Sequence, residues 1–308
     1  MNIEFVHPTL EDRDWISAYY QKSGCRACEC SFVNLYLWGR GYGKVARVGD
    51  FLVQFVEYGG KKFYTFPTGD ADKGDLKFAI DALIEDAKQY GHPMRMTAIT
   101  DCRRERLEKL YPGKFRFTEN RAAFDYLYKV DNLAQLAGKK YQQKRNHCNR
   151  FEQNFPDWET EVLTEETLPV CQEMLAQWFQ MHEGGEESEA MDYRIEKIAL
   201  GRAFEEFTTL GMEGMLLKAE GRVVAFTMGS RIQDDTFDVN FEKAFPDVQG
   251  AYPIINREFA RYVREKYPEI VYLNREDDMG LPGLRRAKES YHPDVLLSKS
   301  FAELEESL

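Results

Sequence analysis

Acidic and basic side chains gather in one stretch near the C-terminus, directly after a short apolar run at 270–273. Glu276, Asp277 or Asp278 could act as a general base that takes a proton from an attacking amine, if burial raises a carboxyl pKa toward neutrality. Nearby basic residues could hold a phosphate, a carboxylate or a developing oxyanion; they are Arg275, Arg285 and Lys288. Because α/β proteins usually bind ligands beyond the carboxyl ends of strands, we predict a site within 271–293.

This stretch supplies most of the candidate site residues. The candidate catalytic residues are Glu276, Asp277 and Lys288, and the candidates for substrate binding are Asn274, Arg275, Arg285 and Tyr291. An alternative interpretation is structural, in which the two acids only neutralise Arg285 and Lys288 in a buried network. The two interpretations differ in whether a carboxylate remains available to a substrate.

A second group of polar residues alternates along the predicted strand near 236–242. Asp238, Asn240 and Glu242 alternate with Phe237, Val239 and Phe241, so the three polar side chains are predicted to share one face of the strand. A polar face on a central strand is costly unless it lines a cavity. We therefore predict a pocket here, in which Asp238 and Asn240 orient the acceptor.

A third group is basic. The segment 138–150 contains no acidic residue although the whole chain has a formal net charge of −11. On a helix, Lys140 and Lys144 would lie on one face with Arg145 beside them. This face would suit a polyanion such as a tRNA acceptor stem, a phospholipid headgroup or the diphosphate of coenzyme A. The alternative is a solvated helix face without a ligand.

Three cysteines lie close together in the sequence CRACEC, at Cys25, Cys28 and Cys30. They resemble half of a zinc site, but the other three cysteines are scattered singly and offer no second pair. We therefore predict no metal site. The three residues are expected to be structural free thiols, with sensitivity to oxidation as the remaining alternative.

Composition limits the class of protein. The chain has 308 residues, of which 43% are hydrophobic and 14% aromatic, enough to fill two cores. The negative net charge argues against a general nucleic-acid coat but leaves room for a local basic groove. No apolar run approaches the roughly 20 residues of a membrane span, and the N-terminus lacks the apolar core of a signal peptide. We therefore expect a cytoplasmic protein.

The expected secondary-structure elements occur twice in the same order: a helix, a three-stranded antiparallel meander, a helix, a strand, a helix and a strand. In the first half we expect the meander at 44–66 and the next helix at 75–91. In the second half we expect one helix at 133–155 and a last strand at 295–298. The repeat predicts two structurally similar halves that meet near residue 130.

Several stretches together resemble a known group of proteins. They are LNREDDMGLPGLRRAKESYHP, SFVNLYLWGR, the Phe66-Pro67-Thr68-Gly69 turn and KKYQQKRNHCNRF. They are similar to an uncharacterised bacterial family related to the C-terminal domain of phosphatidylglycerol lysyltransferases, and the tandem arrangement resembles the Fem-type peptidyltransferases. The resemblance implies an α/β (α+β) fold with two tandem acyl-CoA N-acyltransferase (GNAT)-like domains. Each would be a mixed, mostly antiparallel sheet flanked by helices, with a non-catalytic domain at 1–130 and an active cleft in 131–308.

The resemblance also implies transfer of an acyl or aminoacyl group to an amine or hydroxyl, for example on a lipid headgroup or a peptide. Ordinary acetyltransferases hold coenzyme A with a Q/R-x-x-G-x-G/A loop, whereas residues 242–252 carry only Gln249-Gly250-Ala251 at the expected helix start. Free backbone N–H groups there could still hold an anion. The incomplete loop favours aminoacyl-tRNA over acyl-CoA as donor. The alternatives are an acetyl-CoA-dependent N-acetyltransferase and a non-catalytic ligand-binding protein that kept the fold.

Overall fold

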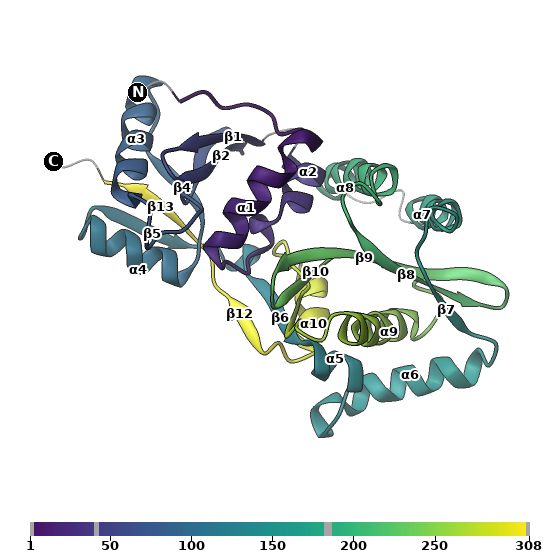
Figure 1. The fold of residues 1–308 in the computed structure, drawn as a ribbon. Coiled ribbons are helices and arrows are strands. Elements are labelled where there is room, and N and C mark those ends of the chain that lie inside the picture. Colours follow the sequence, from purple (N-terminus) through teal and green to yellow (C-terminus); the bar gives the residue numbers. More distant parts are fainter. Residues whose placement is uncertain (1–2, 40–42, 182–186, 306–308) are drawn as a thin grey trace. The chain divides into compact units, whose positions relative to one another are not determined.

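The structure is a computed structural model that describes residues 3–39, 43–181 and 187–305. The chain forms two compact units, each built from separate segments of the sequence (Figure 1). The first unit comprises Met1–Tyr126, Glu276–Arg285 and Leu296–Leu308, and the second comprises Leu127–Arg275 and Arg286–Val295. The division into continuous domains at 1–130 and 131–308 stays a prediction.

The first unit contains a six-stranded sheet in the order β1-β2-β3-β4-β13-β5. Its strands are β1 (Gly43–Val48), β2 (Phe51–Tyr58), β3 (Lys61–Thr65), β4 (Arg95–Ile99), β5 (Phe115–Glu119) and β13 (Ser300–Leu304). The predicted meander is confirmed, because β1, β2 and β3 pair antiparallel in succession. The next pair, β3 with β4, is parallel, and β13 is antiparallel to both of its neighbours.

The described residues of the first unit also form helices, both α-helices and short 3-10 helices (η): α1 (Arg13–Ser23), α2 (Phe32–Gly39), α3 (Leu76–Gln89), α4 (Asp101–Leu110), η1 (Leu10–Asp12), η2 (Cys28–Cys30) and η3 (Arg121–Ala123). The apolar spacing along α3 predicts one buried face. Ile80 and Leu83 on that face lie in one core with Val53 of β2 and Met96 of β4. This core fixes α3 and the loop before it.

The second unit contains a seven-stranded sheet in the order β12-β6-β11-β10-β9-β8-β7. Its strands are β6 (Asp125–Lys129), β7 (Glu159–Val162), β8 (Glu213–Ala219), β9 (Arg222–Gln233), β10 (Thr236–Ala244), β11 (Tyr272–Asn274) and β12 (Val295–Leu297). Its helices are α5 (Val130–Gln135), η4 (Lys139–Tyr141), α6 (Gln142–Asn154), α7 (Leu168–Met181), α8 (Glu187–Glu205) and α9 (Ala251–Lys266). α10 (Pro282–Glu289) begins in the first unit and ends in the second. The ring centroids of Phe237 and Phe259 are 6.0 Å apart, which joins β10 to α9 in the core.

The two ends of β10 differ in their neighbours. Residues 236–238 pair in parallel with 272–274 of β11. β11 ends at Asn274, whereas β10 continues to Ala244. Glu242 and Arg275 therefore lie beyond the residues over which β10 and β11 are paired.

One expectation about the chain path is wrong. The strand at 295–298 is not the last, because β13 follows it and pairs between β4 and β5, where Figure 1 shows it in yellow. The C-terminal strand therefore completes the sheet that the N-terminal residues begin. β13 has only five residues, too few for their alternation to predict a strand. β6 comes early in the sequence and lies between β12 and β11 in the other sheet.

The helix expected at 133–155 is also wrong as a single element, because the chain forms α5, η4 and α6 instead. α5 ends where Leu136 takes a left-handed φ of 49°, and Gly138 follows with a φ of 85°. Arg145 on α6 stabilises this break, since its guanidinium donates to the carbonyl oxygens of Leu136 and Gly138. Within the described residues, no helix is both long enough and apolar enough to cross a membrane.

Candidate functional site

Asp278 is the buried acid of the C-terminal stretch, and it belongs to the first unit. Its carboxylate accepts two hydrogen bonds from Arg285, from Nε and from Nη2, each of 2.9 Å. Arg121 Nη1 donates at 2.9 Å and the Tyr126 hydroxyl at 2.6 Å. The Gly280 N–H donates to the other oxygen at 2.9 Å. The structural interpretation names Glu276 and Asp277 as the acids that neutralise Arg285, whereas in the structure Asp278 has this contact. As a general base, Asp278 is not supported.

These contacts keep Asp278 ionised. Burial alone would raise the pKa of the carboxyl, but the hydrogen bonds from Arg285, Tyr126 and the Gly280 N–H lower it well below its ordinary range. A carboxylate that is saturated with donors and held ionised is a poor general base. Asp278 is therefore a structural anchor for the loop.

Glu276 and Asp277, which are also predicted as bases, directly precede Asp278 in the sequence and have different surroundings. Glu276 is half-buried, has a left-handed φ of 54°, and accepts a hydrogen bond of 2.9 Å from Asn34 Nδ2. Asp277 is also half-buried and accepts a 3.1 Å hydrogen bond from the Met279 N–H. Their role as bases stays a prediction.

The second unit contains a different polar cluster at the end of β11. Arg275 Nη2 donates to Glu242 Oε1 at 2.8 Å, and the other Glu242 oxygen accepts 3.1 Å from Asn256 Nδ2 on α9. The side chains of Arg275 and Glu242 are 13% and 9% exposed, so solvent screens this ion pair little. Sequence reasoning did not identify Asn256. Its signal was a polar residue on the apolar face of a helix.

Aromatic rings surround the guanidinium of Arg275. Its carbon lies 5.0 Å from the ring centroid of Tyr291 and 5.8 Å from that of Tyr128 on β6. Lys144 Nζ of α6 lies 3.8 Å from the Tyr291 centroid. The structure therefore brings together four of the predicted residues, and it adds Asn256 and Tyr128. We call Glu242, Arg275, Lys144, Asn256, Tyr128 and Tyr291 the arginine–tyrosine cluster.

Two buried polar atoms of this cluster have no hydrogen-bond partner among the described residues. They are Arg275 Nη1 and Asn256 Oδ1. A buried donor or acceptor without a partner costs roughly 1–3 kcal/mol. Such atoms are therefore expected to bind water or a ligand, and a guanidinium N–H suits a carbonyl oxygen or an anion. The cluster can thus hold and polarise an acyl carbonyl or bind a phosphate.

Two other polar residues of β10, Asp238 and Asn240, hydrogen-bond to each other, and Asn240 also bonds to Ser230 on β9. Asn240 Nδ2 donates to Asp238 at 3.1 Å, and the Ser230 hydroxyl donates to Asn240 Oδ1 at 2.9 Å. The register of β9 and β10 shifts between Asp238 and Phe241, which breaks the strict alternation of the strand. Asp238 and Asn274 occupy paired positions of β10 and β11 and are fully buried. That these residues orient an acceptor stays a prediction.

Of three other candidates, Lys288 and Arg145 donate to backbone carbonyl groups, whereas the side chain of Lys140 lies near an aromatic ring. Lys288 is buried, and its ammonium group donates to the Arg275 carbonyl oxygen. Arg145 holds the carbonyl groups that follow α5. Lys140 is exposed, its Nζ lies 4.9 Å from the Tyr141 ring centroid, and its carbonyl oxygen lies 3.1 Å from His292 Nε2. Lys288 and Arg145 thus have structural contacts, and their roles with a substrate stay predictions.

The anion site expected at Gln249-Gly250-Ala251 has few donors. Gly250 caps α9 with a φ of 93°, and a Cβ atom there would lie 2.7 Å from the His147 carbonyl oxygen. The Ala251 N–H already donates to Val248 at 3.1 Å, and Pro253 in the same turn has no N–H. A pyrophosphate needs several free amide groups at a helix start. This turn therefore disfavours coenzyme A binding of the usual kind.

A group of possible metal ligands occurs in the first unit, where atoms of Cys28, Glu29 and Asp125 lie within 4.8 Å of one another. The ammonium group of Lys299 is 2.7 Å from each carboxylate and 3.5 Å from the Cys28 sulfur. A lysine thus supplies the positive charge that a metal ion would bring. These residues do not fit a metal site.

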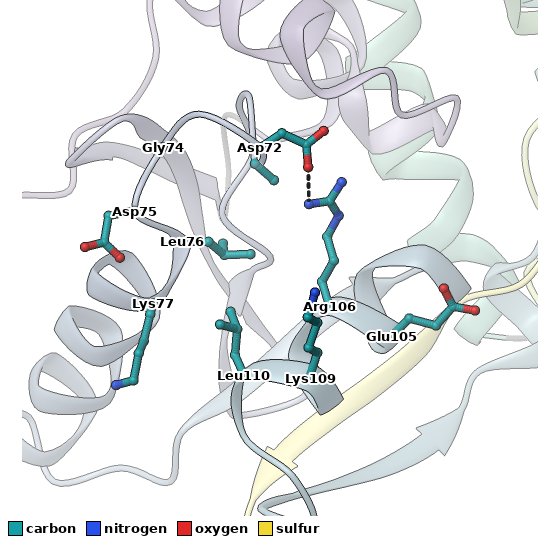
Figure 2. Close-up of a pocket in the computed structure, with 10 residues that line it drawn as sticks. Asp72, Gly74, Asp75, Leu76, Lys77, Glu105, Arg106, Lys109 and Leu110 are labelled. Carbon is teal, nitrogen blue, oxygen red and sulfur yellow. Dashed lines mark hydrogen bonds and ion pairs between the residues drawn. The ribbon is translucent and has the colours of Figure 1, made fainter.

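The first unit also has an open surface cavity of about 620 Å³ beside the start of α3 (Figure 2). Arg106 of α4 reaches across it to Asp72 at 3.0 Å, and Leu76 and Leu110 form its apolar part. Both acidic and basic side chains line it. It contains none of the residues predicted for the site.

Residues 21–303 match the protein family described as phosphatidylglycerol lysyltransferase, C-terminal. The chain belongs to this family. A conserved protein of unknown function from Bacteroides thetaiotaomicron has 40% sequence identity and a TM-score of 0.90, over 98% of this chain and 100% of its own. No curated protein matches the sequence.

Two solved structures of other proteins have lower sequence identity to this lysyltransferase-family chain and share only its fold. L-PGS from Bacillus licheniformis has 19% identity and a TM-score of 0.65, covering 98% of this chain and 94% of its own. FemX has 12% identity and a TM-score of 0.54, covering 98% and 97%. The predicted resemblance and the predicted tandem GNAT-like fold are therefore confirmed.

The first prediction concerns Asp278. Its pKa is lower in the folded protein than in the unfolded chain, so its charge stabilises the fold above about pH 4, and this stabilisation is lost as the pH falls further. At pH 7, Asp278→Asn should lower the free energy of unfolding by roughly 3 kcal/mol, because an amide turns N–H donors toward two guanidinium groups. Urea denaturation measures this change.

The matched control is Asp277→Asn, in which the amide oxygen can still accept from the Met279 N–H. It should change the free energy of unfolding by about 0.5 kcal/mol or less. Equal losses for the two variants would contradict the assignment of Asp278 as the anchor.

The second prediction concerns Lys144. Burial and then the like charge of Arg275 lower the pKa of Lys144 to about 8, against the opposing effects of Cys148 and Glu242. The Lys144 amine should therefore titrate near this value in an NMR titration of lysine side chains. Arg275→Met should raise the midpoint, because it removes the like charge.

Arg231→Met is the control, since Arg231 pairs with Glu269 in the same unit. The Lys144 midpoint should not move in this variant. A wild-type midpoint above about 10, the ordinary lysine range, would contradict the buried position of the amine.

Proposed function

We propose that this protein transfers an aminoacyl group from aminoacyl-tRNA to an amine- or hydroxyl-bearing acceptor, such as a lipid headgroup or a peptide. Membership of the phosphatidylglycerol lysyltransferase C-terminal family supports a transferase. The observation that carries the proposal is that buried Arg275 Nη1 and Asn256 Oδ1 have no hydrogen-bond partner among the described residues, while both side chains contact Glu242. A donor and an acceptor left open on side chains that share a partner are what a reacting acyl group needs.

Arg275 would stabilise the transition state. Attack on the aminoacyl ester turns its carbonyl oxygen into an oxyanion, and a guanidinium N–H aimed at that oxygen binds it more tightly than the ground state. Glu242 holds the guanidinium from the other side at 2.8 Å. Because the pair is buried, little reorganisation is needed when charge develops on the substrate. Asn256 Oδ1 would accept a hydrogen bond from the amino group of the donor or acceptor.

The basic segment at the start of α6 would contact the tRNA. Lys139, Lys140 and Arg150 are exposed, as contacts with a polyanion require. Lys144 of α6 belongs to the arginine–tyrosine cluster, so the segment connects the surface to the proposed site. The few free amides at the start of α9 make acyl-CoA the weaker candidate for the donor.

The test is transfer of radiolabelled lysine from lysyl-tRNA to phosphatidylglycerol vesicles or to a peptide amine. Arg275→Met should lower kcat/KM by about 100-fold or more, the usual effect of losing an oxyanion donor. Arg231→Met, which removes a partly exposed arginine of the same unit, should leave kcat/KM unchanged. Circular dichroism melts would show that both variants fold.

Three results would contradict the proposal. A wild-type kcat/KM for Arg275→Met would show that the arginine–tyrosine cluster takes no part in the reaction. If wild type binds lysyl-tRNA but no aminoacyl-tRNA yields product with either acceptor, the non-catalytic alternative would replace the enzymatic one. Stabilisation by coenzyme A thioesters but not by charged tRNA would favour the acetyltransferase alternative.

A further inference from the structure

Two cysteines of the first unit share a buried arginine. Arg103 of α4 is 6% exposed, and its Nη2 lies 3.1 Å from Cys30 Sγ and 3.2 Å from Thr68 Oγ1. Its Nη1 donates to the Ala98 carbonyl oxygen at 3.1 Å. The guanidinium is therefore fixed on one side by neutral oxygen acceptors and faces sulfur on the other.

The second sulfur belongs to Cys25, which lies between α1 and η2. The Cys25 and Cys30 side chains are hydrogen-bonded to each other. Cys30 is buried at the end of η2, where its N–H donates to the Ala27 carbonyl oxygen at 2.8 Å. Cys25 is half-buried and Cys30 is buried, so Cys25 is the more exposed residue of the two. The structure thus pairs the thiol of a half-buried residue with the thiol of a buried one.

The surroundings give the two thiols different acidities. The hydrogen bond from Cys30 lowers the pKa of Cys25 to about 6, against burial and with help from Arg103. The same hydrogen bond, together with burial, raises the pKa of Cys30. At neutral pH the pair is therefore a reactive thiolate beside a protonated thiol, the state that oxidation by peroxides requires.

The neighbouring thiols lack this arrangement. Cys28 is buried, and its sulfur lies 3.4 Å from an Asp125 oxygen. Burial and the Asp125 charge raise the pKa of Cys28, so it is a poor nucleophile. Cys102 is exposed, and its sulfur lies 3.3 Å from the Thr100 hydroxyl. In an oxidation experiment, Cys28 is therefore the control for a buried thiol and Cys102 the control for an exposed one.

We propose that Cys25 and Cys30 are an oxidisable thiol pair, which a hydroperoxide converts into a disulfide. The Cys25 thiolate attacks one peroxide oxygen, the O–O bond breaks, and the other oxygen leaves and takes up a proton. The Cys30 thiol then loses its proton and attacks the Cys25 sulfenic acid, so that an S–S bond forms and water leaves. The two sulfurs lose two electrons in total, and the peroxide gains them.

Arg103 is a positioning residue in this reaction. Its charge favours the thiolate of Cys25, and its contact with Cys30 holds the second sulfur in place. Oxidation removes the negative charge that faces Arg103 and leaves neutral acceptors at the guanidinium. Lysine keeps the positive charge and methionine removes it. The thiol pair should therefore be oxidised faster in Arg103→Lys than in Arg103→Met.

The experiment treats the full chain with hydrogen peroxide at neutral pH, alkylates the remaining thiols and maps tryptic peptides by mass spectrometry. Trypsin cleaves after Arg26, between the two cysteines, so the expected disulfide links two separate peptides. Cys28→Ser should still form this link, which assigns the second sulfur to Cys30. Cys30→Ser should instead accumulate a sulfenic acid at Cys25 that dimedone labels.

Three outcomes would overturn the proposal: a link from Cys25 to Cys28, oxidation of Cys102 before Cys25, or no dimedone label at Cys25 in a folded Cys30→Ser protein. Thermal melts of each variant establish that it is folded. The readout is covalent and needs no transfer activity, so failure of the proposed function would leave this result unaffected.

Discussion

The carboxylate of Asp278 keeps its charge without access to solvent, and this constraint fixes the path of the C-terminal stretch. A buried carboxylate is tolerated only if donors surround it. Arg121 and Tyr126 come from the segment around β6, while Arg285 and the Gly280 N–H come from the loop itself. The loop that follows Arg275 is therefore held to the first unit by charge as well as by packing.

The same principle explains why the arginine–tyrosine cluster is a better candidate site than the acidic loop. Asp278 has donors at both of its oxygens. Arg275 is held by Glu242 on one side and by tyrosine rings, yet its Nη1 remains open among the described residues. Lys144 adds a second positive charge nearby, so the cluster is cationic and anion binding would relieve the repulsion between Lys144 and Arg275.

The sequence predicted the meander, the repeated order of elements and the family, because these depend on local periodicity and on a long specific run of residues. It could not predict which of three adjacent acids turns inward. That choice depends on left-handed φ angles at Glu276 and Met279. Nor could it predict β13 between β4 and β5, or the partners Asn256 and Tyr128, because distant segments supply them. The CRACEC cysteines suggested half of a metal site, whereas Arg103 and Lys299 supply the positive charge there.

The central claim is that Arg275 Nη1 binds the aminoacyl carbonyl group. The most direct measurement is nitrogen-15 NMR of the arginine side chains during titration with an adenosine that carries lysine through an amide in place of the ester. The Arg275 side-chain resonance, assigned from the Arg275→Lys variant, should shift on binding while the Arg231 resonance does not. Binding of the analogue with no change at Arg275 would contradict the account.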